Sequence, residues 1–149
     1  MPTEIEGNLG EEIAKKGGEV GATTGRPRRC GWFDAVSVKR IIQSNSVSAL
    51  CLTKIDVLDG LENIKICTSY DEDESKKAFA ECMELEDVNP SYIEIEGWPE
   101  PTAGINNYDD FPRRAKNFVE KIAEVCGVPV DIVSTGPDDA STILINQEI

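Results

Sequence analysis

Histidine is absent from this sequence of 149 residues. Histidine is the side chain whose unperturbed pKa lies closest to neutral pH, and it is also the commonest metal ligand. Its absence excludes the commonest general base of enzymes that act at neutral pH, together with every histidine-ligated metal site, from this chain. Any chemistry that the chain takes part in must therefore use other side chains.

Positive charge is scarce, and long apolar runs are missing. The 15 basic residues against 28 acidic ones give a formal net charge of −13, which repels polyanions. We therefore expect no general binding of nucleic acid and no binding of an anionic membrane, and any phosphate must be bound by a local cluster. No run of apolar residues has the length that crosses a bilayer, and the first residues are acidic.

Paired cysteine motifs are also missing. The five cysteines are odd in number and none is spaced as C-x-x-C, so the sequence predicts neither a disulfide framework nor a zinc knuckle. Reduced thiols buried in a cytoplasmic protein are the preferred interpretation. The five positions are Cys30, Cys51, Cys67, Cys82 and Cys126.

What is present is the composition of a globular protein, with 40% hydrophobic residues and a length that fits one domain. Helical spacing of apolar residues predicts helices after Asp34 and after Asp110, and a weaker helical pattern lies around Leu9 and Ile13. Short apolar or alternating runs predict strands at 47–52, 64–68, 92–95, 128–133 and 142–145. We therefore expect an α/β fold with a largely parallel sheet flanked by helices. Residues 71–89 carry eight acidic groups against two lysines and are predicted to form a solvated surface excursion.

Two polar strings follow predicted strands, where ligands of open α/β sheets bind. The first is T-K-I-D at 53–56, which is similar to the guanine-specifying N-K-x-D element of GTPases. A carboxylate after a strand can accept hydrogen bonds from both N1–H and the amino group of guanine, while the lysine stem packs on the ring. The second is S-T-G-P-D at 134–138, whose glycine permits close approach of the backbone to a ring. An ordinary turn remains the alternative for each string.

A cationic loop occupies residues 21–29, G-A-T-T-G-R-P-R-R, within this acidic chain. Its guanidiniums and hydroxyls suit a small dicarboxylic acid or a phosphate, because guanidinium binds such groups through two parallel hydrogen bonds. The alternative is that these arginines pair with carboxylates of the protein itself. The sequence contains no G-x-x-x-x-G-K-[ST] phosphate loop.

Taken together and in order, these strings resemble the C-terminal portion of adenylosuccinate synthetases. The longest matching strings are GATTGRPRRCGWFD at 21–34, LTKIDVLDG at 52–60 and GVPVDIVSTGPD at 127–138. The resemblance runs over nearly the whole chain and is weakest at 71–89. It implies the fold of that family, which is similar to P-loop nucleotide-binding proteins. It also implies a GTP-dependent ligase that joins IMP and L-aspartate into adenylosuccinate, GDP and phosphate, a step in the synthesis of AMP.

The resemblance assigns roles to residues of this chain. The loop would close over the substrate aspartate, with Arg26 between aspartate and the ribose of IMP and Arg28 serving both aspartate and the GTP side. The loop residues implied to bind substrate are Ala22, Thr23, Thr24, Gly25, Arg26, Pro27 and Arg28. Those implied to bind GTP are Arg28, Lys54, Ile55, Asp56, Ser134, Thr135 and Gly136.

The same resemblance implies that part of the active site lies elsewhere. The phosphate loop of the family, its catalytic Asp, which also ligates magnesium, and its catalytic His match no residue here. We therefore expect residues 1–149 to be a C-terminal fragment that is inactive alone, with the magnesium ligands in the N-terminal part. The full enzyme is expected to be a homodimer. A free-standing guanine-nucleotide-binding module and an acidic interaction scaffold are the alternatives.

Overall fold

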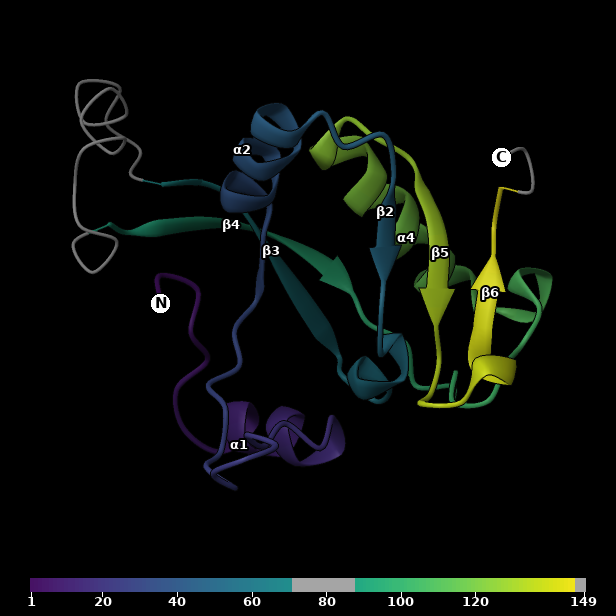
Figure 1. The fold of residues 1–149 in the computed structure, drawn as a ribbon, viewed down its shortest axis with the longest axis horizontal. Helices are drawn as coiled ribbons and strands as arrows, with labels where there is room; N and C mark the ends of the chain where they lie inside the picture. Colours follow the sequence, from purple (N-terminus) through teal and green to yellow (C-terminus); the bar gives the residue numbers. More distant parts are fainter. Residues whose placement is uncertain (71–87, 147–149) are drawn as a thin grey trace. The chain divides into compact units, whose positions relative to one another are not determined.

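The computed structural model describes residues 1–70 and 88–146. Its contacts divide the chain into two compact units, and the chain passes between them three times (Figure 1). The first unit holds Met1–Val36 and Lys65–Glu94, and the second holds Ser37–Ile64 and Ile95–Ile149. Most of the acidic segment predicted as a surface excursion lies outside the described residues. None of the described helices combines the length and the apolar character needed to cross a membrane.

The first unit is built around one small sheet and a short helix. Helix α1 (Asn8–Lys16) follows the weak helical pattern noted in the sequence. The strands pair in the order β1 (Phe33–Asp34), β3 (Asn63–Tyr70) and β4 (Pro90–Glu96), and β1 runs parallel to β3. A core cluster of Cys67, Tyr70 and Val88 packs with Val36 and Tyr92.

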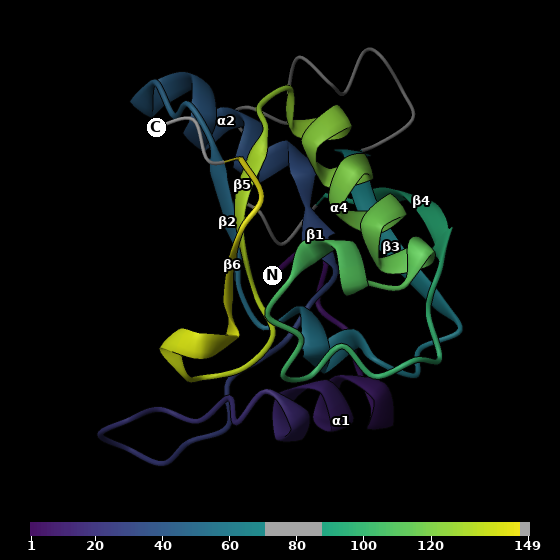
Figure 2. The same cartoon turned by 90° about the vertical axis from the view of Figure 1, so that its right-hand side faces the viewer.

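The second unit contains a three-stranded sheet with one helix packed on it. Strand β2 (Leu50–Leu52) runs parallel to β5 (Val130–Ser134), and β6 (Thr142–Leu144) pairs antiparallel with β5. Helix α4 (Arg113–Cys126) covers one face of this sheet (Figures 1 and 2). Its buried stripe includes Phe118, whose ring centroid lies 5.7 Å from that of the fully buried Trp98.

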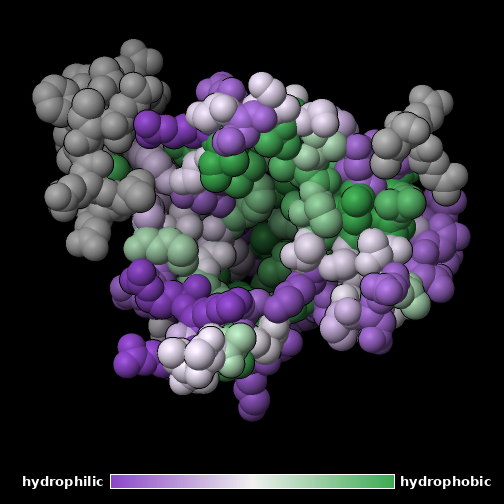
Figure 3. Space-filling model, viewed as in Figure 1, coloured by the Kyte–Doolittle hydropathy of each residue, from purple (hydrophilic) through white to green (hydrophobic). Residues whose placement is uncertain are grey.

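Short elements complete the second unit. Helix α2 (Ala35–Asn45) enters it from the first unit. The 3₁₀ turns are η1 (Ile55–Leu58), η2 (Tyr108–Asp110) and η3 (Asp139–Ser141). Hydrophobic side chains gather over the region of β5 and β6 in Figure 3. Leu144, the last residue of β6, is 52% exposed, so this sheet presents apolar surface to solvent.

The α/β class is confirmed, and the parallel arrangement is present in part: β1 runs parallel to β3 and β2 runs parallel to β5, whereas β6 runs antiparallel to β5. The helix predicted after Asp34 is present as α2 (Ala35–Asn45), but β2 begins three residues later than the apolar run at 47–52. The reason is local: Ser46 has a positive φ of 53°, and the Val47 N–H bonds back to the carbonyl of Ile42. Residues directly after α2 therefore finish the helix instead of joining the sheet.

The expectation of buried thiols holds for two of the described cysteines. Cys67 and Cys126 are buried, whereas Cys30 is half-buried and Cys51 is exposed on β2. None of these four cysteines forms a disulfide with another described residue. Cys82 lies outside the described residues.

Candidate functional site

Parallel pairing of β2 with β5 brings the two predicted base-binding strings together. Both strands end at the same edge of the sheet, so the residues after Leu52 and after Val133 become neighbours. The backbone N–H of Lys54 donates a 3.0 Å hydrogen bond to Ser134 Oγ across a separation of 80 residues. We call the two segments, 53–59 and 134–138, the β2 arm and the β5 arm of the candidate base site.

The β2 arm turns sharply at Lys54. This residue has φ 59° and ψ 41°, the left-handed conformation, which costs a non-glycine residue roughly 1–2 kcal/mol. The turn starts η1 at once, and the Val57 N–H donates to the Lys54 carbonyl at 3.1 Å. Buried Ile55 and Val57 anchor η1 on both sides of Asp56. Strain in a lysine two residues before the predicted base-reading carboxylate is typical of a functional turn.

Asp56 carries an unsatisfied oxygen at this turn. Its Oδ1 atom is buried and has no hydrogen-bond partner among the residues that the structure describes. A buried carboxylate oxygen without a partner loses hydration without compensation, so such groups are rare in folded proteins. The arrangement suits a ligand that donates a hydrogen bond to this atom.

Hydrogen bonds of the buried Thr135 hold the β5 arm in place. Thr135 is 1% exposed, its N–H donates to the Ser141 carbonyl at 2.9 Å, and its hydroxyl donates to the Ile105 carbonyl at 2.7 Å. A Cβ on Gly136 would lie 2.9 Å from Ser141 Oγ, so only glycine fits without a shift of that side chain. Thr135 and Gly136 thus fix the arm, and half-buried Ser134 contacts the β2 arm.

One side chain near this site, that of Asp59, was not among the predicted site residues. The Asp59 carboxylate accepts hydrogen bonds from Trp98 Nε1 at 2.6 Å, from Thr102 Oγ1 at 2.7 Å and from Thr102 N at 2.6 Å. The signal that could have found it is an aspartate one 3₁₀ turn after Asp56, followed much later by the string G-W-P-E-P-T at 97–102, in which Trp98 and Thr102 are buried.

The predicted substrate loop forms an exposed hairpin in the first unit, described here by itself. Val20 and Pro27 form an antiparallel bridge, and the Gly21 N–H donates to the Arg26 carbonyl at 2.9 Å. Gly25, with φ 63°, turns the chain at the tip. Residues 22–29 are all exposed, and the hairpin extends beyond α1 (Figure 2).

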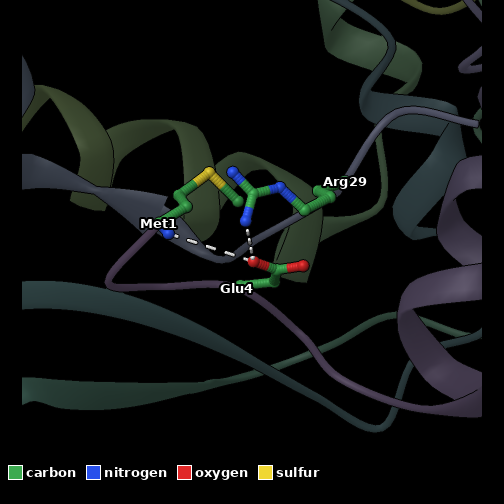
Figure 4. A network of polar contacts seen from close by, with 3 residues as sticks. All are labelled: Met1, Glu4 and Arg29. Carbon is green, nitrogen blue, oxygen red and sulfur yellow. Dashed lines mark hydrogen bonds and ion pairs between the residues drawn. The ribbon is translucent and has the colours of Figure 1, made fainter. Parts of the chain in front are cut away.

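Two of the three hairpin arginines contact the protein's own carboxylates. Arg28 lies 3.1 Å from Glu19, and Arg29 lies 3.0 Å from Glu4. The terminal amino group of Met1 also approaches Glu4, at 3.9 Å (Figure 4). No carboxylate within the described ranges pairs with Arg26. The alternative of internal pairing thus applies to Arg28 and Arg29, whose exposed pairs are each worth about 0–1 kcal/mol.

A cavity lies beside the hairpin. Its volume is about 680 Å³, and its lining comes from residues 4–7, from α1 and from both sides of the hairpin. Glu19, Arg28 and Arg29 line it together with Glu4. The ion-paired arginines therefore face a space that a small ligand can enter.

A magnesium site is not formed by the residues in hand. Over 1–70 and 88–146, no group of three or more cysteine, aspartate or glutamate side chains lies close enough to hold a metal ion. The expectation that the magnesium ligands lie in the N-terminal part of the enzyme stays a prediction.

Comparison with known proteins decides the family. The family model described as adenylosuccinate synthetase matches residues 1–143. The chain belongs to the adenylosuccinate synthetase family. Adenylosuccinate synthetases of Nitrosomonas eutropha and of Histophilus somni strain 129Pt are 49% and 48% identical to it, over 98% and 97% of this chain. A structure of fully ligated adenylosuccinate synthetase from Plasmodium falciparum matches 98% of this chain with a TM-score of 0.88 and 31% identity.

The match covers only part of those relatives. This chain spans 35% and 34% of the two bacterial proteins and 36% of the Plasmodium chain. It is therefore similar to about a third of an adenylosuccinate synthetase.

Proposed function

We propose that this chain supplies the guanine-recognition arms and the aspartate-binding hairpin of an adenylosuccinate synthetase. The activity of the whole enzyme would be the joining of IMP and L-aspartate. GTP phosphorylates the 6-oxygen of IMP, and the aspartate amine displaces that phosphate to give adenylosuccinate, GDP and phosphate. The observation that carries the proposal is the buried, unpartnered Oδ1 of Asp56 at the carboxyl end of β2.

Guanine fits the β2 arm for a chemical reason. Guanine presents two adjacent donors, N1–H and the 2-amino group, and a carboxylate can accept both. Adenine has an acceptor at N1 and no 2-amino group, so it leaves Asp56 Oδ1 unsatisfied. The Lys54 stem would cover the ring face, and Ile55, Ser134, Thr135 and Gly136 would complete the base pocket.

The hairpin is proposed to bind the substrate aspartate. Arg26 has no carboxylate partner among the described residues, and the exposed Thr23 and Thr24 present hydroxyls beside it. Ala22, Gly25 and Pro27 shape the hairpin around these groups. Arg28 would exchange Glu19 for a ligand carboxylate or for the GTP side, because an exposed ion pair costs little to break.

This chain alone is proposed to have no ligase activity. The family's catalytic Asp and His correspond to no residue here, and the chain contains no histidine at all. The whole enzyme is proposed to be a cytoplasmic homodimer that uses magnesium.

Nucleotide titration tests the base site. Isothermal titration calorimetry of the chain with GDP and with ADP is expected to show weak binding, because phosphates normally supply much of the affinity. We expect GDP to bind at least tenfold more tightly than ADP, since two hydrogen bonds to a charged acceptor are worth about 1.5–3 kcal/mol each.

Substitution of the carboxylate separates base recognition from general binding. Asp56→Ala is expected to bring the two affinities within twofold of each other. Asp110→Ala, which removes an exposed carboxylate of η2, is the matched control and should keep the preference. Equal affinities of the unmutated chain for GDP and ADP would overturn the base-site assignment.

A further inference from the structure

The Asp59 carboxylate ties the β2 arm to a buried segment of the second unit. Asp59 lies one 3₁₀ turn after Asp56, and its N–H donates to the Asp56 carbonyl at 3.1 Å. Its side chain holds Trp98 and Thr102 through the three short hydrogen bonds described above. Both partners are fully buried, at 0% exposure. Charge-assisted bonds of 2.6–2.7 Å to buried partners are among the stronger hydrogen bonds in proteins.

The segment that Asp59 holds continues to the β5 arm. The Ile105 N–H donates to the Thr102 carbonyl at 3.1 Å, which folds residues 102–105 into a turn. The Ile105 carbonyl accepts the Thr135 hydroxyl at 2.7 Å, and the Gly104 N–H donates to the Thr135 carbonyl at 3.3 Å. Residues 102–105 therefore link the two arms. Thr102 bonds to Asp59 of the β2 arm, and Gly104 and Ile105 bond to Thr135 of the β5 arm.

These contacts close a ring around the candidate base site. On one side Lys54 N–H bonds directly to Ser134 Oγ. On the other, the path from Asp56 runs through Asp59, the bridge 102–105 and Thr135 back to the β5 arm. Every link of the second path is a hydrogen bond or a covalent connection, so a change at Asp59 frees one end of the bridge.

We propose that Asp59 is a positioning residue for guanine recognition, which sets the spacing of the β2 and β5 arms through Thr102 and the bridge 102–105. The inference rests on the proposed guanine site. Asp59 contacts Trp98 and Thr102 and not the base, and it acts by holding Asp56 in position. Binding groups must be held to within about half an ångström for full effect, so a loosened arm lowers discrimination between bases.

The experiment measures the ratio of ADP to GDP dissociation constants together with the thermal unfolding midpoint. Asp59→Asn keeps the size of the side chain but replaces an acceptor by a donor, and we expect the ratio to fall at least fivefold. ADP affinity should change less than twofold, because adenine does not use Asp56. Asp110→Asn, with the same change of charge at an exposed position of η2, should leave the ratio unchanged.

A second pair of variants keeps the test decisive if Asp59→Asn does not fold. Thr102→Val removes one donor to Asp59 and should lower the ratio two- to threefold, whereas Thr102→Ser retains the hydroxyl and should preserve it. A purely structural role would lower the unfolding midpoint and weaken both nucleotides equally. In the Asp56→Ala background, neither variant should change the ratio further.

The outcomes separate the two proposals. A GDP preference that Asp56→Ala abolishes, but that Asp59→Asn and Thr102→Val leave within twofold, overturns the role of Asp59 and retains the guanine site. Absence of any preference in the unmutated chain overturns the guanine site and this inference with it.

Discussion

Cys67 lies in the core of the first unit near the half-buried carboxylate of Asp34. Burial, and to a lesser degree the nearby Asp34 carboxylate, raise the pKa of its thiol from 9.0 to about 11. The hydroxyl of Tyr70 donates to Asp34, so this carboxylate is itself held in place. The environment keeps the thiol neutral over the whole physiological range.

This shift predicts a loss of stability at alkaline pH. Below pH 9 the thiol is protonated in both states, and between 9 and 11 only the unfolded chain releases its proton. The free energy of unfolding should therefore fall by up to about 1.4 kcal/mol per pH unit in that window because of Cys67. Urea unfolding at pH 8, 9, 10 and 11 under reducing conditions measures it.

The contribution of Cys67 is isolated by substitution. Cys67→Ala should be less stable at pH 8 but should lose stability more slowly between pH 9 and 11 than the unmutated chain. Cys51→Ala, at an exposed thiol, should keep the original pH dependence. Parallel curves for Cys67→Ala and the unmutated chain would contradict the prediction.

Local sequence patterns predicted some of the candidate site residues but not others. Lys54, Asp56 and Ser134 stand in short strings at strand ends, so the sequence predicted them, and the contact between Lys54 and Ser134 is present. Asp59 was missed because its partners lie 39 and 43 residues away, and no local pattern marks them. The binding roles of these three residues and of the hairpin residues 22–28 stay predictions.

At the level of elements, α4 shows how one residue ends a helix. Gly127 follows Cys126 with φ 74° and ψ 16°, and its N–H donates to the Ala123 carbonyl at 2.9 Å. A Cβ at this position would meet nothing within 4 Å, so the need for glycine is conformational and not steric.

Gly127→Ala is therefore expected to destabilise by about 1 kcal/mol, the cost of the left-handed conformation for alanine. For a chain of this length that corresponds to roughly 2–4 °C in the unfolding midpoint. Thermal unfolding followed by circular dichroism measures the change. Gly127→Asn should lose less, because asparagine tolerates this conformation better. An unchanged or higher midpoint for Gly127→Ala would be the contrary result.

Helices were predicted more closely than strands for a physical reason. The buried stripe of α4 recurs at helical spacing, so its sequence reveals it. Strand limits depend on partners instead. The two-residue β1 was not predicted, because Phe33 and Asp34 are extended only by pairing with Ile66 and Cys67 of β3.

At the scale of the molecule, the charge of −13 acts on all elements at once. Self-repulsion of like charges destabilises a compact chain, and salt screens it over about 10 Å at 0.1 M. Raising NaCl from 10 to 300 mM should therefore raise the unfolding midpoint by a few degrees. Loss of the exposed ion pairs should offset little of this gain.

Two salts make the test specific. Sodium chloride and potassium chloride should give the same rise at equal ionic strength, because screening depends on charge and not on the ion. A midpoint that falls with either salt would show that attractive ion pairs outweigh the net repulsion.

The large-scale arrangement was the least accessible to sequence reasoning. The length fits one domain, whereas the contacts divide the chain into two units, each with a three-stranded sheet. The pairing of β2 with β5 joins segments 80 residues apart, as the bond from Lys54 to Ser134 shows. Periodicity reports which face of a strand is buried, but the order of strands follows from these distant contacts.

The chain passes between the two units after Val36, Ile64 and Glu94, and these passages limit how the gene can recombine. Neither unit is a continuous stretch of sequence. A single recombination breakpoint anywhere between Val36 and Glu94 separates pieces of the same unit from one another. One such breakpoint therefore cannot exchange either unit whole between two related genes.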